Sequence, residues 1–195
     1  MSDLIASSSI ARALLVASFI VMLLAEVSVR LRNVTARTST RMDRGSVLAV
    51  VGGIATGGLV AGWCSAKVPA LAIHRSWFAF VVALALIWSG IILRQWAVWV
   101  LGRFFTVVVR VDEAQQTVDR GPFRWVRHPS YTGLLLTFAG IGLAAGNWLS
   151  LAALLIFPTI GLLVRIRVEE RALLSSLDGY RDYARGRARL IPGVW

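Results

Sequence analysis

The hydrophobic positions of this chain fall into five long apolar segments that are separated by polar breaks. The segments cover residues 13–29, 47–66, 77–93, 131–145 and 148–164. A transmembrane helix needs roughly 17–25 predominantly apolar residues, so most of the segments can cross a bilayer and 131–145 is marginal. The pattern predicts an all-α integral membrane protein with about five transmembrane helices.

The polar breaks differ in their arginine content. Segments 30–46, 94–130 and 165–195 are rich in arginine, whereas 67–76 holds one lysine and one arginine and 146–147 holds no basic residue. Because arginine collects in cytoplasmic loops, this alternation predicts an outside N-terminus and a cytoplasmic C-terminus. Only Gly146 and Asn147 separate the last two segments, which predicts a tight antiparallel hairpin. Residues 104–111 are β-branched and aromatic, and they fit a short strand, an interfacial segment or a helix end.

Composition supports a membrane protein and narrows the function classes. The 195 residues are 57% apolar and 16% charged, with a net charge of +11 and a mean hydropathy of +0.70. No aromatic and basic platform stands apart from the apolar segments, so nucleic acid is not an expected partner. One cysteine and two histidines exclude an internal disulfide and a Cys- or His-rich metal cluster. Asp3 is the only charge before Arg12, so the first segment lacks the basic start of a signal peptide and is predicted to be a retained span.

The second apolar segment contains two pairs of glycines at a spacing of four residues. Gly53 precedes Gly57, and Gly58 precedes Gly62. This spacing lets transmembrane helices approach each other closely. A phosphate-binding loop is the alternative, but no Lys-Ser/Thr follows the glycines and they lie inside a predicted span. We therefore expect helix packing.

The densest group of polar and aromatic side chains lies in residues 121–133, before the fourth segment. Anchoring at the lipid headgroups explains Arg124 and Trp125 well. It does not explain the run Arg127-His128-Pro129, because a helix entry needs none of these residue types in that order. Pro129 suits the first turn of a helix, so this helix is expected to begin there.

A second charged group, residues 165–171, continues the fifth segment. Arg165 and Glu169 are four residues apart on one helical face, and Glu170 is three residues from Arg167. Pairs within the helix are the simplest interpretation. Ionisable residues close to membrane depth are, however, candidates for a functional site. We expect Glu169 to face inward, because it shares a face with Arg165 and Leu173.

The third group contains Tyr180 and Tyr183, followed by Arg189-Leu190-Ile191-Pro192 and Trp195. This tail has the composition of a segment that docks onto the body of the protein. Together, Arg127-His128-Pro129-Ser130-Tyr131-Thr132-Gly133, Glu169-Glu170 with Leu173, Tyr180 and Tyr183, and Leu190-Ile191-Pro192 resemble the isoprenylcysteine carboxyl methyltransferase family. The resemblance covers about residues 94–195. This chain departs from the family at Asp178-Gly179-Tyr180, where its loop is one residue shorter.

The resemblance implies an S-adenosylmethionine-dependent enzyme whose cofactor pocket lies on the cytoplasmic side of its C-terminal half. Residues 94–195 would then form the catalytic half, and residues 1–93 would supply three N-terminal spans. The cofactor-binding residues that it implies are Gly121, His128, Pro129, Tyr131, Glu169, Glu170 and Tyr183. The catalytic residues that it implies are Glu169 and, as the anchor of the acceptor, Arg127, Arg165 or Arg167.

The chemistry of these residue types is compatible with carboxyl methylation. A carboxylate acceptor is ionised at pH 7, so the enzyme needs alignment, exclusion of water and a cation rather than a strong base. The expected acceptor is a prenylated cysteine or a similar lipidic acid, and lipids of the membrane are further expected partners. Lipid N-methylation would require a base. A NADPH-dependent sterol reductase and a non-enzymatic membrane adaptor are the remaining alternatives.

Overall fold

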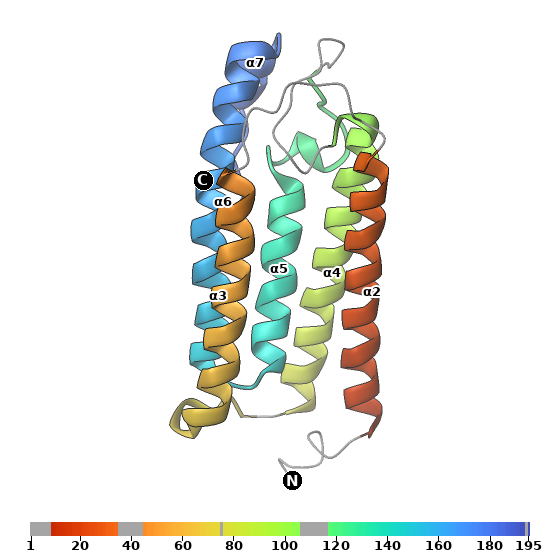
Figure 1. Cartoon of the computed structure of the whole chain (residues 1–195). Coiled ribbons are helices and arrows are strands. Elements are labelled where there is room, and N and C mark those ends of the chain that lie inside the picture. The colour runs from red at the N-terminus through yellow and green to blue at the C-terminus, as the bar shows by residue number, and fades with distance from the viewer. Residues whose placement is uncertain (1–8, 35–44, 75, 106–116, 194) are drawn as a thin grey trace.

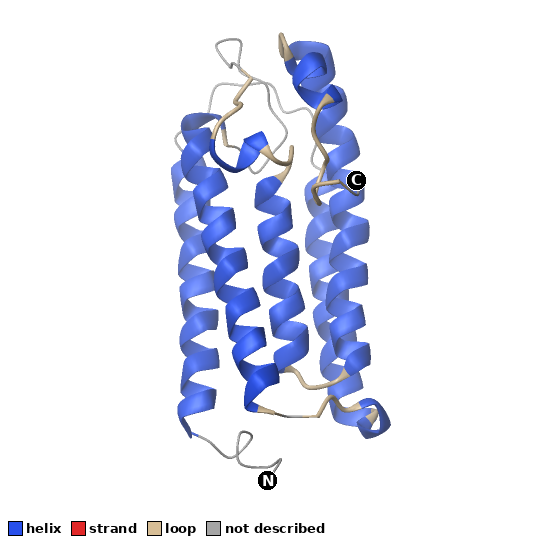
Figure 2. Cartoon of the chain, turned by 180° about the vertical axis from the view of Figure 1, so that it is seen from behind, coloured by secondary structure: helices blue, strands red, loops and turns tan. Residues whose placement is uncertain are grey.

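The computed structural model describes residues 9–34, 45–74, 76–105, 117–193 and 195. Six α-helices form the protein in this part of the chain: α2 (Ser9–Val34), α3 (Gly45–Lys67), α4 (Trp77–Leu101), α5 (Pro129–Ala144), α6 (Trp148–Ser176) and α7 (Tyr180–Arg185). The described residues contain only isolated β-bridges and no β-strand (Figure 2). The expected all-α fold is confirmed. Residues 106–116, most of the segment with the possible strand, lie outside the described residues.

Four of the helices are long and apolar enough to cross a membrane. These are α2 over Ser9–Val29, α3, α4 and α6, whereas α5 is a shorter apolar helix of 16 residues. The marginal segment of the sequence is therefore also the short helix of the structure. Large apolar side chains face outward along the bundle, for example Phe78 at 79% and Leu59 at 76% exposure, as expected for surfaces that contact lipid.

Helices α4 and α6 extend furthest beyond the apolar segments that predict them. Helix α4 continues past residue 93 to Leu101, because Arg94 is paired with Glu26 of α2 and apolar residues resume after it. Helix α6 continues past residue 164 to Ser176 and carries the charged residues 165–171. The polar groups of the site are therefore held on rigid helix.

The predicted hairpin between the last two segments is present. Gly146 has a φ of 69°, and the side chain of Asn147 accepts hydrogen bonds from the backbone N–H groups of Leu149 and Ser150. The Asn147 amide also donates to the carbonyl of Val68, 2.8 Å away. One asparagine thus begins α6 and ties it to the end of α3.

Helix α3 packs on α6 and α4 packs on α5, while α5 and α6 join the two pairs (Figure 1). One of the two glycine pairs is used as predicted. A Cβ on Gly53 would lie 2.5 Å from the carbonyl oxygen of Phe157, and one on Gly57 would lie 3.0 Å from that of Ala153. Gly58 and Gly62 have nothing within 4 Å of a Cβ position, so the expected close packing does not occur there.

Helix α2 contacts α4 and lies at the side of the bundle opposite α3 and α6 (Figure 1). Polar contacts between α2 and α4 include Trp88 to Ser18 at 3.1 Å and Arg94 to Glu26. The C-terminal ends of α2, α4 and α6 and the beginnings of α3 and α5 lie at one end of the bundle, together with α7 (Figure 1). The three arginine-rich segments start from this end, as the predicted topology requires.

Candidate active site

The run Gly121 to Pro129 forms a compact turn over the beginning of α5. Gly121 has a φ of 58° and starts a short 3-10 helix, Gly121–Arg124. The chain after this helix runs beside the C-terminal tail. The backbone N–H of Arg127 donates to the carbonyl of Ala188 at 2.9 Å, and that of His128 donates to the carbonyl of Arg189 at 3.0 Å. The tail therefore docks onto the candidate site, and Pro129 begins α5 as expected.

Glu170 lies at the centre of a buried cluster of charged side chains. Its carboxylate is 2.7 Å from Arg127 Nη1, 2.9 Å from Arg189 Nε and 3.2 Å from His128 Nε2. The side chain of Glu170 is only 8% exposed. These partners come from the turn before α5 and from the tail, so tertiary contacts replace the expected pair with Arg167. A buried carboxylate needs such partners, because desolvation of an unpaired charge is costly.

Glu169 points away from this cluster and takes part in a second one. Tyr131 Oη donates a hydrogen bond to Glu169 Oε2 at 2.6 Å and accepts one from Arg165 Nε at 3.2 Å. Arg165 Nε and Glu169 Oε2 are 4.0 Å apart. Arg165 Nη1 donates a hydrogen bond to Ser46 Oγ at 3.0 Å. The phenol of Tyr131 thus lies between a buried cation and a carboxylate.

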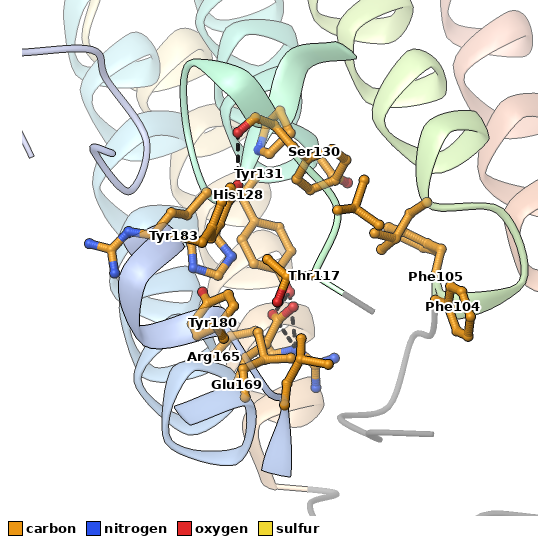
Figure 3. Close-up of a pocket in the computed structure, with 17 residues that line it drawn as sticks. Phe104, Phe105, Thr117, His128, Ser130, Tyr131, Arg165, Glu169, Tyr180 and Tyr183 are labelled. Atoms are coloured by element: carbon orange, nitrogen blue, oxygen red, sulfur yellow. Dashed lines mark hydrogen bonds and ion pairs between the residues drawn. The ribbon is translucent and has the colours of Figure 1, made fainter. Parts of the chain in front are cut away.

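A cavity, which we call the site cavity, lies between these clusters and the end of α4 (Figure 3). Its wall is mostly aromatic and aliphatic, with hydroxyl groups and the ionisable side chains of Arg127, His128, Arg165 and Glu169. The lining residues are Leu101, Phe104, Phe105, Thr117, Val118, Phe123, Arg127, His128, Pro129, Ser130, Tyr131, Arg165, Glu169, Leu173, Leu177, Tyr180 and Tyr183. Phe104 and Phe105 lie across the cavity from His128, Tyr180 and Glu169 (Figure 3).

Two buried polar atoms of this wall have no hydrogen-bond partner within the described structure. They are Tyr180 Oη and Arg127 Nε. Buried polar groups are nearly always paired, so unpaired donors at a cavity wall indicate a place where a ligand binds. Burial raises the pKa of Tyr180 above its ordinary value and raises that of Tyr183 to about 12. Both phenols are therefore neutral donors at pH 7, and Tyr183 Oη donates to the carbonyl of Phe123 at 2.8 Å.

Most of the residues expected at the site line the cavity, and three do not. Those that line it are Arg127, His128, Pro129, Tyr131, Arg165, Glu169 and Tyr183. Gly121 serves as a turn residue with positive φ, and a Cβ at this position would lie 2.8 Å from the side chain of Val100. Glu170 lies behind the wall and orients Arg127 and His128. Arg167 is exposed on the opposite side of α6 and is not part of the cavity, because it lies two residues from both Arg165 and Glu169 on the helix.

Sequence reasoning missed several lining residues. Phe104 and Phe105 begin the β-branched and aromatic segment 104–111, which was not placed at the site from the sequence, and no pattern pointed to Thr117. Leu177 continues the helical face of Glu169 and Leu173, which was expected to face inward, at a spacing of four residues, and that spacing is a usable signal. Tyr180 lines the cavity despite the shorter loop before it.

Known proteins resemble this chain in sequence and in fold. The family model for phospholipid methyltransferase matches residues 78–177. Protein-S-isoprenylcysteine O-methyltransferase A of Arabidopsis thaliana is 32% identical over 126 residues, which are 63% of this chain and 64% of that protein. The uncharacterized protein YpbQ of Bacillus subtilis (strain 168) is 33% identical over 98 residues, which are 50% of this chain and 57% of that protein.

A solved structure shares the arrangement of helices. The structure of the eukaryotic intramembrane Ras methyltransferase ICMT (isoprenylcysteine carboxyl methyltransferase) without a monobody matches with a TM-score of 0.61 and 25% sequence identity. The match covers 74% of this chain and 52% of that chain. The chain thus spans between about half and two thirds of the length of each of these proteins.

Proposed function

Because this chain belongs to the phospholipid methyltransferase family, we propose that it transfers a methyl group from S-adenosylmethionine to the carboxylate of a prenylated cysteine or a similar lipidic acid. The observation that carries the proposal is the row Arg165, Tyr131 and Glu169 in the wall of the site cavity. It offers a cation for an acidic acceptor beside a carboxylate for a positively charged donor.

The residues of the site cavity fit S-adenosylmethionine. This cofactor supplies a methyl group on a positively charged sulfur. Tyr180 and Tyr183 offer aromatic faces for the adenine ring or for the positive charge, and Glu169 offers a negative charge. The two unpartnered donors, Arg127 Nε and Tyr180 Oη, suit the carboxylate and hydroxyl groups of the cofactor. Glu170 would hold Arg127 and His128 in place for this contact.

Arg165 suits the acceptor carboxylate. Arg165 is only 5% exposed and lines the cavity, where charge pairing is strong because water is scarce. When bound, the cofactor would supply an electrophilic methyl group to an ionised carboxylate that Arg165 holds, and a neutral ester and a neutral thioether would be the products. No proton is transferred, so the protein needs only to align the carboxylate and exclude water. The aromatic and aliphatic wall formed by Phe104, Phe105 and Leu173 would exclude it.

An amine acceptor is the second candidate. A protonated amine must lose a proton before it attacks, and Glu169 is a carboxylate in the cavity wall that could receive it. Arg165 opposes this candidate, because a buried guanidinium raises the cost of placing an ammonium group nearby. A carboxylate acceptor would therefore depend on Arg165 as its binding partner, whereas an amine acceptor would depend on Glu169 as its base.

We also propose that the two halves of the chain have different roles. All residues that line the site cavity lie between Leu101 and Tyr183, which supports a cofactor site within residues 94–195. The helices of residues 1–93 add Ser46 beside Arg165 and Glu26 beside Arg94. The arginine-rich end of the bundle, which carries the cavity, would face the cytoplasm.

The test uses the purified protein in lipid nanodiscs. We expect S-adenosylhomocysteine to bind in isothermal titration and NADPH not to bind. We expect methyl ester formation with N-acetyl-S-farnesylcysteine and no methylation of phosphatidylethanolamine. Methylation of the amine alone would assign the second candidate, and binding of NADPH alone would assign the chain to a reductase.

A pair of variants separates the site from membrane anchoring. His128→Ala removes a cavity residue that pairs with Glu170, whereas Arg124→Ala removes an exposed arginine from the same turn. Loss of a hydrogen bond to a charged partner costs about 1.5–3 kcal/mol, or about ten- to a hundredfold in rate. We expect that loss for His128→Ala and a change below threefold for Arg124→Ala. Equal activity in both variants would mean that the cluster is structural.

A further inference from the structure

A second cavity adjoins the site cavity, and the proposed transfer reaction does not use it. The two share Phe105, Tyr131 and Arg165. The second cavity, which we call the apolar cavity, has walls that are aliphatic or aromatic except at the end with Arg165, Glu26 and Arg94. Its other lining residues are Met22, Val47, Val50, Val51, Ile54, Leu134, Phe138 and Leu162.

The helices that line the apolar cavity set its length. Tyr131 and Phe138 are seven residues apart on α5, and Val47 and Ile54 are seven residues apart on α3. At a rise of 1.5 Å per residue, each pair spans about 10 Å, roughly the length of eight carbons in an extended chain. The cavity thus extends about two helical turns from Arg165 toward the middle of the bundle.

A packed layer of side chains lies at the far end of the apolar cavity. Phe138 is 7% exposed and belongs to a cluster with Ala61, Ala153 and Leu154. Ile54 packs against the same cluster. At this level α3 approaches α6 closely, since a Cβ on Gly57 would meet the carbonyl oxygen of Ala153 at 3.0 Å.

Another hollow, which we call the lower hollow, begins on the other side of this layer. It is lined by Gly58, Ala61, Gly62, Ser65, Ala66, Ile141, Ala145 and Leu154. Tyr131, Leu134, Phe138 and Ile141 follow one another at spacings of three and four residues, so they form one stripe along α5. Phe138 is the residue of that stripe in the layer that separates the apolar cavity from this lower hollow.

We propose that the apolar cavity binds the hydrocarbon tail of the methyl acceptor and that Phe138 determines how much of the tail is buried. The proposal rests on the proposed function for the identity of the acceptor. A carboxylate held at Arg165 lies at the boundary of the two cavities, so the chain attached to it has the apolar cavity beside it. Glu26 and Arg94 pair with each other, with Nη2 and Oε2 3.0 Å apart, and so add no net charge to this wall.

The first arm of the test measures kcat/KM for N-acetyl-S-alkylcysteines with straight chains of 4 to 16 carbons. Burial of one methylene corresponds to about a fourfold gain in affinity. We expect wild-type kcat/KM to rise by about this factor per carbon up to roughly eight carbons and then to level off. We expect Phe138→Ala to move that limit to longer chains by joining the lower hollow. Leu134→Trp should move it to about four carbons.

Leu136→Ala is the matched control. Leu136 is an aliphatic residue of α5 that lies two residues from both Leu134 and Phe138, on the other side of the helix, and it lines none of the three cavities. Its chain-length profile should equal that of the wild type. If Phe138→Ala does not fold, Leu134→Trp still tests the proposal, because it fills space rather than removing it.

The second arm does not require methyl transfer. An N-acetyl-S-octylcysteine with a diazirine at the end of its chain is photolysed with the protein, and the labelled peptides are identified by mass spectrometry. We expect labelling at Phe138 or Ile54, and competition by the unmodified octyl compound. Labelling there without methylation of any acceptor would refute the proposed function and support the tail site. Methylation with unchanged profiles in the Phe138 and Leu134 variants, or label placed elsewhere, would refute the tail site alone.

Discussion

The phenol of Tyr131 connects the two charged groups on which the proposed chemistry depends, so Tyr131→Phe tests the site directly. The substitution keeps the ring and removes one hydroxyl. That hydroxyl donates to Glu169 at 2.6 Å and accepts from Arg165 at 3.2 Å. Each of these hydrogen bonds has an ionised partner, and such bonds contribute about 1.5–3 kcal/mol. We expect kcat/KM for methyl transfer to fall by about ten- to a hundredfold.

A double-mutant cycle makes the test specific. Glu169→Gln keeps the shape of the side chain and removes its charge, so it weakens the same hydrogen bond from the other side. The effects of Tyr131→Phe and Glu169→Gln should therefore not multiply, and the double variant should lose less activity than their product. The assay is initial-rate methyl ester formation at saturating S-adenosylmethionine, with thermal unfolding of each variant as the control for folding. Multiplicative effects, or full activity of Tyr131→Phe, would refute the reasoning.

Three further predictions concern stability and topology. Glu170→Gln should lower the free energy of unfolding by about 2–3 kcal/mol, because it leaves buried cations without their carboxylate; a midpoint temperature equal to that of the wild type would contradict this. Burial raises the pKa of Tyr183 to about 12, against an unfolded value near 10. Stability should therefore hold up to about pH 10 and fall from pH 10 to 12, and the fall should be smaller in Tyr183→Phe. Single cysteines at Asp178 and at Lys67 should react with impermeant reagents from opposite faces of the membrane, with Asp178 on the cytoplasmic face.

The positions of the helices could be predicted from the sequence alone, because the signals that begin and end an apolar helix are local. Long apolar stretches, the Gly146-Asn147 break and Pro129 each act within one or two helical turns, and the helices begin close to where these signals lie. The helix ends were less predictable. Arg94 interrupts the apolar stretch of α4, and its partner Glu26 lies far away in the sequence, so the local pattern did not show that the buried part of the helix continues beyond it.

The candidate site was predictable in its residue types and less so in its pairings. Pairing within the helix was the simplest interpretation of Glu170, and the resemblance placed it in the cofactor pocket. Its partners instead come from the turn before α5 and from the tail, and it lies behind the cavity wall. The four glycines of α3 look alike in sequence. Only the position of α6 decides that Gly53 and Gly57 are used for close packing and that Gly58 and Gly62 are not.

The pair of Glu26 and Arg94 has a consequence for how the protein is made. Each charge must enter the membrane on its own helix, and a charged residue at a helix centre raises the cost of insertion by about 2.5–3.5 kcal/mol, with less cost toward the end. Once both helices are in place, each charge neutralises the other. Glu26→Leu would therefore make α2 a better substrate for the insertion machinery while leaving Arg94 without its carboxylate. Selection for efficient insertion and selection for a stable bundle act on this residue in opposite directions.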